Sequence, residues 1–152
     1  MKRGKYRKAI FAVTYAITKG EIEYILLRRK KHWVGWEFPK GKIEKFETKR
    51  MAVKREVKEE TGLKVLKIKK FHLKGIYNYD RELKDRPGMI GQTYRLFSAE
   101  VKKGKVSLDK KEHDSYKWFS FREAEKKLTW PNQKECLNLV NTWLKRRLYA
   151  LK

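Results

Sequence analysis

Three glutamates at helical spacing are the residues of this sequence best suited to chemistry. Glu56, Glu59 and Glu60 stand at positions i, i+3 and i+4, and at about 100° per residue they share one side of a helix. Like charges at these spacings destabilise an isolated helix by about 0.2–0.5 kcal/mol per pair. A divalent cation would remove this conflict, because Mg²⁺ takes oxygen ligands and combines carboxylates with waters and substrate phosphates.

The neighbouring residues leave two interpretations of these acids open. Ala52 and Val53 share their side of the helix, whereas Lys54 and Lys58 point the other way. The acids should therefore face the protein body, which favours a metal site. The alternative is a solvated face of the helix, although such a face would intersperse acidic and basic residues.

The segment from Gly41 to Leu63 resembles the Nudix box, the motif of the Nudix hydrolase family. Its pattern is Gly, five residues, Glu, seven residues, Arg-Glu, an aliphatic residue, any residue, Glu-Glu, any residue, Gly and an aliphatic residue. Every position is matched, by Gly41, Glu47, Arg55, Glu56, Val57, Glu59, Glu60, Gly62 and Leu63. Because the pattern is long and its spacing is fixed, a chance match is rare.

The resemblance implies a role for each matched position. Glu47 and Arg55 would pair and hold the loop against the helix. The ligands of the divalent ion, Mg²⁺ with Mn²⁺ as the alternative, would be Glu56, Glu59, Glu60 and the carbonyl oxygen of Gly41. The resemblance also implies the Nudix fold, an α+β fold (α/β/α sandwich) in which a mixed β-sheet is flanked by helices and the box forms a loop-helix-loop motif.

The reaction that the resemblance implies is hydrolysis of a phosphoanhydride bond in a nucleoside polyphosphate. Metal ions neutralise the polyphosphate and lower the pKa of a bound water, and a carboxylate accepts the proton of the attacking water. The general base stays open among Glu56, Glu60 and Glu112.

Segments flanking the box narrow the choice of substrate. Residues 36–44 (WEFPKGKIE) and 94–101 (YRLFSAEV) are similar to asymmetrical dinucleoside tetraphosphate hydrolases. Tyr77 and Tyr79 lie at about the distance after the box where that subgroup carries a substrate-stacking tyrosine. The resemblance favours diadenosine tetraphosphate, split to ATP and AMP. Nudix RNA 5′-pyrophosphohydrolases share these flanks, and in both groups a glutamate at the position of Glu112 serves as an extra metal ligand or base.

Outside the box, each assignment has a structural alternative. Lys40, beside the box loop, is a candidate phosphate contact or a solvated lysine. Tyr77 and Tyr79 either offer stacking faces to a base or belong to the core. Glu112 is either catalytic or a turn carboxylate, and we expect His113 to be a surface or structural residue.

The apolar pattern predicts a mixed sheet with helices on both faces, because strands come mostly in pairs and helices stand mid-chain and at the end. The predicted strands are residues 10–17, 22–27, 63–79, 92–101, 106–108 and 116–119, with 33–38 as a short strand or extended loop. The predicted helices are residues 48–61, 121–128 and 131–149. Turns or loops are expected at residues 19–20, 40–42, 80–91 and 103–105.

Length and composition limit the number of domains and the class of protein. The 152 residues, 40% of them hydrophobic, fit one domain over residues 1–152 with a single core. No stretch approaches the roughly 18 apolar residues of a membrane span, so we expect a soluble, cytoplasmic protein with no membrane partner. Cys136 is the one cysteine, which excludes an intrachain disulfide, and its apolar neighbours predict a core position.

The charge balance indicates polyanionic partners. With 41 Lys and Arg against 18 Asp and Glu, the formal charge is +23, and a field of that sign attracts nucleotides and RNA, although a lysine-rich proteome would produce the same excess. Three hypotheses remain: diadenosine tetraphosphate hydrolysis, removal of pyrophosphate from RNA 5′ ends, and a non-catalytic nucleic-acid-binding module on the same scaffold. The expected partner is a nucleoside polyphosphate substrate or, in the second hypothesis, an RNA 5′ end.

Overall fold

The central strand β1 (Lys5–Thr18) fixes the frame of the molecule. Its residues 9–16 (AIFAVTYA) are buried on both faces, and a continuous apolar run suits a strand covered on both sides. This computed structural model describes residues 4–151, so residues 1–3 and 152 of the expected domain lie outside the described residues. The other strands are β2 (Glu21–Arg29), β3 (Gly35–Glu37), β4 (Lys40–Lys42), β5 (Val65–Asn78), β6 (Met89–Val101) and β7 (His113–Phe119).

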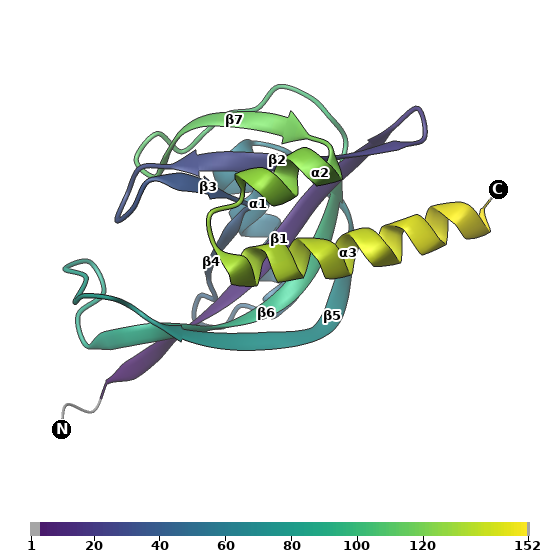
Figure 1. Cartoon of the computed structure of the whole chain (residues 1–152). Helices are drawn as coiled ribbons and strands as arrows, with labels where there is room; N and C mark the ends of the chain where they lie inside the picture. The colour runs from purple at the N-terminus through teal and green to yellow at the C-terminus, as the bar shows by residue number, and fades with distance from the viewer. Residues whose placement is uncertain (1–3, 152) are drawn as a thin grey trace.

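The strands form one mixed sheet in the order β3-β2-β1-β6-β5, with β4 paired to β1 and β7 paired to β2 (Figure 1). β1 and β2 make the predicted hairpin, and its turn has positive φ at Lys19 and Gly20, 52° and 79°. Two-residue hairpin turns of this hand match the twist of the strands. β6 runs parallel to β1 and antiparallel to β5, so the predicted mixed sheet is confirmed.

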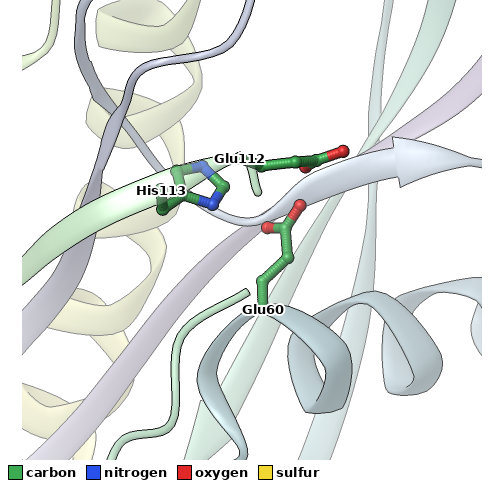
Figure 2. Close-up of side chains that lie close together, drawn as sticks. All are labelled: Glu60, Glu112 and His113. Carbon is green, nitrogen blue, oxygen red and sulfur yellow. The ribbon is translucent and has the colours of Figure 1, made fainter. Parts of the chain in front are cut away.

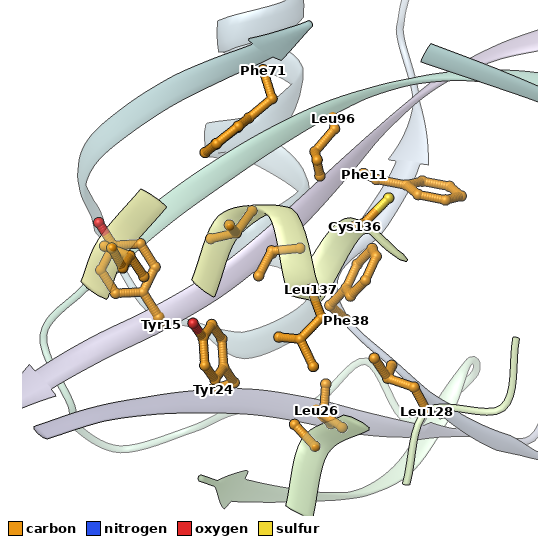
Figure 3. Close-up of a cluster of buried hydrophobic side chains, with 14 of the residues drawn as sticks. Phe11, Tyr15, Tyr24, Leu26, Phe38, Phe71, Leu96, Leu128, Cys136 and Leu137 are labelled. Atoms are coloured by element: carbon orange, nitrogen blue, oxygen red, sulfur yellow. The ribbon is translucent and has the colours of Figure 1, made fainter. Parts of the chain in front are cut away.

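Helices cover both faces of this sheet, as predicted. Alternate residues of β1 pack against different helices: Phe11 and Val13 belong to the cluster with α2 (Phe121–Lys127) and α3 (Pro131–Ala150), whereas Ile10 belongs to the cluster with α1 (Lys49–Thr61). Figure 3 shows Phe11, Leu96, Cys136 and Leu137 in the first cluster. Cys136 is fully buried, and burial raises the pKa of its thiol to about 12.

The α/β/α sandwich predicted from the sequence is therefore confirmed. None of the helices within residues 4–151 combines the length and the apolar character that crossing a membrane requires.

Helix α1 begins and ends where the sequence predicts. The side chain of Thr48 accepts a hydrogen bond from the Met51 amide at 3.1 Å, which caps the first turn. Gly62 ends the helix with φ 77°, a left-handed conformation that favours glycine, and its N–H donates to the Lys58 carbonyl. These two ends fix which side chains of α1 face the sheet.

Three local predictions are wrong, and in each case contacts between distant segments determine the structure. Residues 89–91, expected at the end of a loop, belong to β6 and pair with β1 and β5. Residues 40–42, expected as a loop, form β4 because Lys40, Gly41 and Lys42 pair with β1. Residues 106–108, expected as a strand, have no regular structure. Instead, Ser107 donates its N–H to the Thr61 carbonyl at 2.8 Å, so this segment covers the end of α1. A three-residue apolar alternation does not distinguish a strand from such a cover.

Replacing Thr48 by alanine should lower the free energy of unfolding by about 1 kcal/mol, because the Met51 amide loses its acceptor. Urea denaturation followed by circular dichroism measures the change. Lys54→Ala, at an exposed position of the same helix, is the control and should change stability by less than about 0.5 kcal/mol. Equal effects of the two substitutions would contradict the capping role.

Candidate active site

Carboxylates from α1 and from the turn before β7 converge on one spot. Glu56 and Glu60 are only 9% and 2% exposed. Figure 2 shows Glu60, at the end of α1, beside Glu112 and the ring of His113. Ligand atoms of Glu60, Glu112 and His113 all lie within 4.8 Å of one another. The fold therefore brings together two carboxylates of the predicted site that are 52 positions apart in the chain (112 − 60).

These acids are held in an environment that disfavours their charge. Burial, together with the nearby Glu59 and Glu112, raises the pKa of Glu56 to about 7 despite its contact with Arg55. Burial and the charges of Glu56, Glu37 and Glu112 raise the pKa of Glu60 well above its ordinary value. Within residues 4–151, neither Glu60 nor Glu112 forms a salt bridge. Converging carboxylates of which only Glu56 is paired with a cationic side chain fit a hard divalent ion.

Gly41 lies against the acid cluster and leaves room for the carboxylate of Glu56. A side chain at this position of β4 would collide with the carboxylate of Glu56. The neighbouring Lys40 amide donates to Glu60 Oε2 at 3.3 Å. The backbone of β4 therefore sits directly over both buried acids of α1, which agrees with the ligand role proposed for the Gly41 carbonyl.

Arg55 links α1 to the loop between β4 and α1 through hydrogen bonds. Its Nε and Nη2 donate to the two carboxylate oxygens of Glu47 at 2.8 and 2.9 Å, and Nη2 also donates to the Lys42 carbonyl at 2.8 Å. Its Nη1 reaches Glu56 Oε1 at 2.7 Å. This bidentate pair has the geometry of the brace that the sequence resemblance implies for Glu47 and Arg55.

Glu59 departs from the expectation that all three box acids face the protein body. Its side chain is 57% exposed, and it lies 3.3 Å from Arg55 Nη1. The reason is helical geometry: positions 56 and 60 differ by about 40° around the axis, whereas position 59 is about 100° from position 60. Glu59 therefore stands at the solvent side of the cluster.

A third buried carboxylate, Glu37, contacts the charged residues beside the acid cluster. Its Oε2 accepts from Arg29 Nη1 at 3.1 Å and lies 2.8 Å from His113 Nε2, while Lys40 Nζ is 3.6 Å from Oε1. Burial alone would raise the pKa of Glu37, but Lys40, His113 and Arg29 outweigh it and lower the pKa to about 2. His113 is fully buried, so of the surface and structural positions expected for it, the surface position is wrong. Sequence reasoning missed Glu37; the signal was an acid within an otherwise apolar strand.

Next to these acids lies a cavity of about 430 Å³. Lys40, Tyr77 and Tyr79 line it, so the structure brings all three candidate substrate contacts to one cavity. Tyr77 also packs against the core, so both interpretations of this residue hold in part. Tyr79 accepts a hydrogen bond from Arg86 Nη1 at 3.0 Å, and that guanidinium lies 5.6 Å from its ring centre.

The cavity also contains residues that sequence reasoning did not assign to it. Trp33 and Trp130 line it and form an edge-to-face pair with ring centres 5.3 Å apart. Asn132 and Gln133, in the first turn of α3, line the cavity with buried amide oxygens that have no hydrogen-bond partner among the described residues. They come from segments about 100 positions apart, which no local pattern connects.

Comparison with known families identifies the family to which this chain is related. The sequence model of the NUDIX domain matches residues 5–140. The chain belongs to the NUDIX family. That match covers the acid cluster, β4 and the cavity strands, and NUDIX enzymes use divalent metal ions, for which the carboxylate and histidine group of this chain is suited.

Individual NUDIX relatives differ in what their names say they act on. An RNA pyrophosphohydrolase of Nitratiruptor sp. is 29% identical over 129 residues, which are 81% of this chain and 83% of the relative. An 8-oxo-dGTP diphosphatase of Buchnera aphidicola is 41% identical over 69 residues, 44% of this chain and 51% of the relative. The chain is therefore a NUDIX hydrolase, an enzyme acting on acid anhydrides.

A solved structure shows the same NUDIX fold. The Ap4A hydrolase of C. elegans, in a binary complex, superimposes with a TM-score of 0.72 at 24% identity and covers 91% of this chain and 98% of its own. At that identity the likeness establishes the fold.

Without divalent metal, the free energy of unfolding should fall as pH rises. Without metal, Glu56 keeps its proton up to about pH 7 in the folded state, whereas the unfolded chain releases it near 4.5. Between these pH values the unfolded state binds fewer protons, so Glu56 lowers the free energy of unfolding by up to about 3 kcal/mol as pH increases. Thermal melts with chelator at several pH values measure this loss, and added Mg²⁺ or Mn²⁺ should reverse it above pH 7.

The control separates this site from other carboxylates. A Glu56→Gln, Glu60→Gln double variant should melt higher than the wild type in chelator and respond little to metal, because no buried charge remains to be balanced. Glu44→Gln, which changes an exposed acid, should behave like the wild type. If added metal left the melting temperature of the wild type unchanged above pH 7, the proposed metal site would be wrong.

Proposed function

We propose that this NUDIX hydrolase cleaves a phosphoanhydride bond in a nucleoside polyphosphate with Mg²⁺, and that its preferred substrate is diadenosine tetraphosphate, split to ATP and AMP. The observation that carries the proposal is the contact between the acid cluster and the aromatic cavity. Lys40 joins the two: its amide donates to Glu60 and its side chain lines the cavity. A polyphosphate beside Lys40 would thus meet the carboxylates while its base enters the cavity.

Mg²⁺ would be held by Glu56, Glu60 and Glu112, with Glu59 at the solvent side and the Gly41 carbonyl as a further ligand. When bound, the ion supplies charge neutralisation for the polyphosphate and lowers the pKa of a water. The proton of the attacking water passes to one of the carboxylates Glu56, Glu60 and Glu112. The burial of Glu56 and Glu60 limits the access of bulk water to these two carboxylates.

Cationic and aromatic side chains of the cavity would bind the rest of the substrate. Lys40 and Arg86 offer positive charge to phosphate oxygens. Tyr79 and Tyr77 form one aromatic pair in the cavity, and Trp33 and Trp130 form another. Two aromatic pairs suit a ligand with a base at each end, because each base gains about 1–3 kcal/mol by stacking.

The relatives support a second candidate. The RNA pyrophosphohydrolase of Nitratiruptor sp. matches over most of both chains, and the +23 charge attracts RNA. Removal of pyrophosphate from RNA 5′ ends would use the same carboxylates and the same Lys40. The intact acid cluster counts against a third hypothesis, a non-catalytic nucleic-acid-binding module.

Separate Glu56→Gln and Glu60→Gln variants should each lose about 10²–10⁴-fold in kcat with diadenosine tetraphosphate, because each removes a charged oxygen ligand or the proton acceptor. Chromatography of ATP and AMP measures the product. Glu44→Gln is the control and should retain activity.

The same assay compares substrates. Full activity of both variants would rule out the mechanism, and a clear preference for 5′-triphosphate RNA over the dinucleotide would replace the first candidate by the second. Metal-dependent turnover of any nucleoside polyphosphate would exclude the non-catalytic module.

Tyr79→Ala should raise KM for the dinucleotide about 5- to 150-fold, the equivalent of the 1–3 kcal/mol that one stacked base contributes. The value of kcat should change little, because stacking is equal in the ground state and the transition state. Steady-state kinetics measures both constants. Tyr116→Ala, at an exposed tyrosine of β7 outside the cavity, should leave KM unchanged; an equal rise in both variants would contradict the stacking role.

A further inference from the structure

A second groove, of about 830 Å³, lies at the other end of α3 from the substrate cavity. The first turn of α3, with Gln133, lines the substrate cavity, whereas Trp143 and the residues after it line the groove. Ten residues of helix separate these positions by about 15 Å. The opposite wall is the first half of β5 around Ile68. The proposed catalysis uses none of these residues.

Positive charge is concentrated in this groove with few acidic partners, although Arg50 Nη1 donates to the Ile68 carbonyl at 3.2 Å. One acid lines it, Glu100, whose carboxylate accepts a hydrogen bond from the Tyr15 hydroxyl at 3.3 Å. The basic residues lining it are Arg50, Lys67, Lys69, Lys70 and Arg147. Within the described part of the chain, residues 4–151, none of these five forms a salt bridge. Cations from α1, β5 and α3 thus face one hollow where their mutual repulsion is unrelieved, and a polyanion would relieve it.

The floor of the groove is apolar and aromatic. Trp143 and Leu144 line it from α3, whereas Ile68 packs against the α1 cluster on the other face of the sheet and lines the groove at the edge strand β5. Lys69 Nζ and Arg147 Cζ lie 5.2 and 5.5 Å from the ring centre of Trp143, so two cations are held over the floor by the aromatic ring. Single-stranded nucleic acid presents both phosphates and unpaired bases, whereas a duplex turns mainly phosphates outward. This combination of lining favours the single strand.

We propose that this groove binds the sugar–phosphate backbone of single-stranded nucleic acid, at a site separate from the catalytic centre. An anionic membrane surface is the competing class, because Tyr149 and Leu151 near the end of α3 are 79% and 77% exposed. The cations, however, line a hollow between helix and sheet, and a flat surface does not reach into it. The proposal does not rest on the proposed function, since the ligand need not carry a phosphoanhydride.

The test uses fluorescently labelled single-stranded RNA and DNA of about 12 nucleotides, a length typical of such sites, each with a 5′-hydroxyl end. Fluorescence anisotropy against salt concentration measures affinity for the wild type and for a Lys67→Gln, Lys70→Gln, Arg147→Gln variant. The control variant, Lys54→Gln, Lys105→Gln, Lys126→Gln, removes the same charge at exposed positions outside the groove.

We expect the groove variant to bind at least about tenfold more weakly and its log–log salt slope to fall by about 2, since each phosphate contact contributes about 0.7 for single strands. The control should lose little, and both variants should keep the circular-dichroism spectrum and the melting behaviour of the wild type, which shows that they fold. Separate arms with RNA and DNA identify the preferred strand.

Three outcomes would overturn the proposal. Equal losses in the groove and control variants would show that only net charge matters. Displacement of the oligonucleotide by a saturating non-hydrolysable nucleotide would place binding in the catalytic cavity. Binding of vesicles rich in anionic lipid that depends on the groove residues, without oligonucleotide binding, would assign the groove to a membrane surface.

Discussion

The burial of like-charged carboxylates in a small volume is the constraint on which the site depends. Glu56 and Glu60 lie under β4, and no cation among the described side chains balances Glu60. Holding acids in this way costs folding free energy, so other features must keep them there. Two such features are the glycine at position 41, which leaves room for the Glu56 carboxylate, and Arg55, which pairs with Glu47 and also donates to Glu56.

Two neighbouring buried carboxylates show how the chain separates structural from functional charge. Glu37 has Arg29, Lys40 and His113 around it, and its pKa falls to about 2. Glu60, close by, has only a backbone amide as a hydrogen-bond donor within residues 4–151, and its pKa rises. Glu37 is thus a permanent anion that fixes its neighbours. Glu60 has no salt-bridge partner among the described residues, which suits the ligand role proposed for it.

What could be predicted from the sequence is what short-range geometry determines. Most of the box residues lie on one helix or just beside it, so the extent of this helix and the burial of Glu56 and Glu60 were predicted. The exposure of Glu59 was missed because sharing a side of a helix does not mean equal burial. β4, the partners of Glu37 and the cavity walls depend on contacts between distant segments, which spacing in one sequence does not reveal.

The net positive charge of the chain attracts anionic ligands towards the acid cluster, an effect that the geometry of the cluster alone does not provide. A polyphosphate repels carboxylates at short range, yet a net charge of +23 attracts it at longer range. Lys40 and Arg86 continue that attraction into the cavity, next to Glu60 and Tyr79. Salt screens separated charges beyond about 10 Å at ordinary ionic strength. The distant lysines therefore act mainly on the rate at which the substrate encounters the protein. The close cations and the metal ion must therefore supply the interactions that hold the bound substrate.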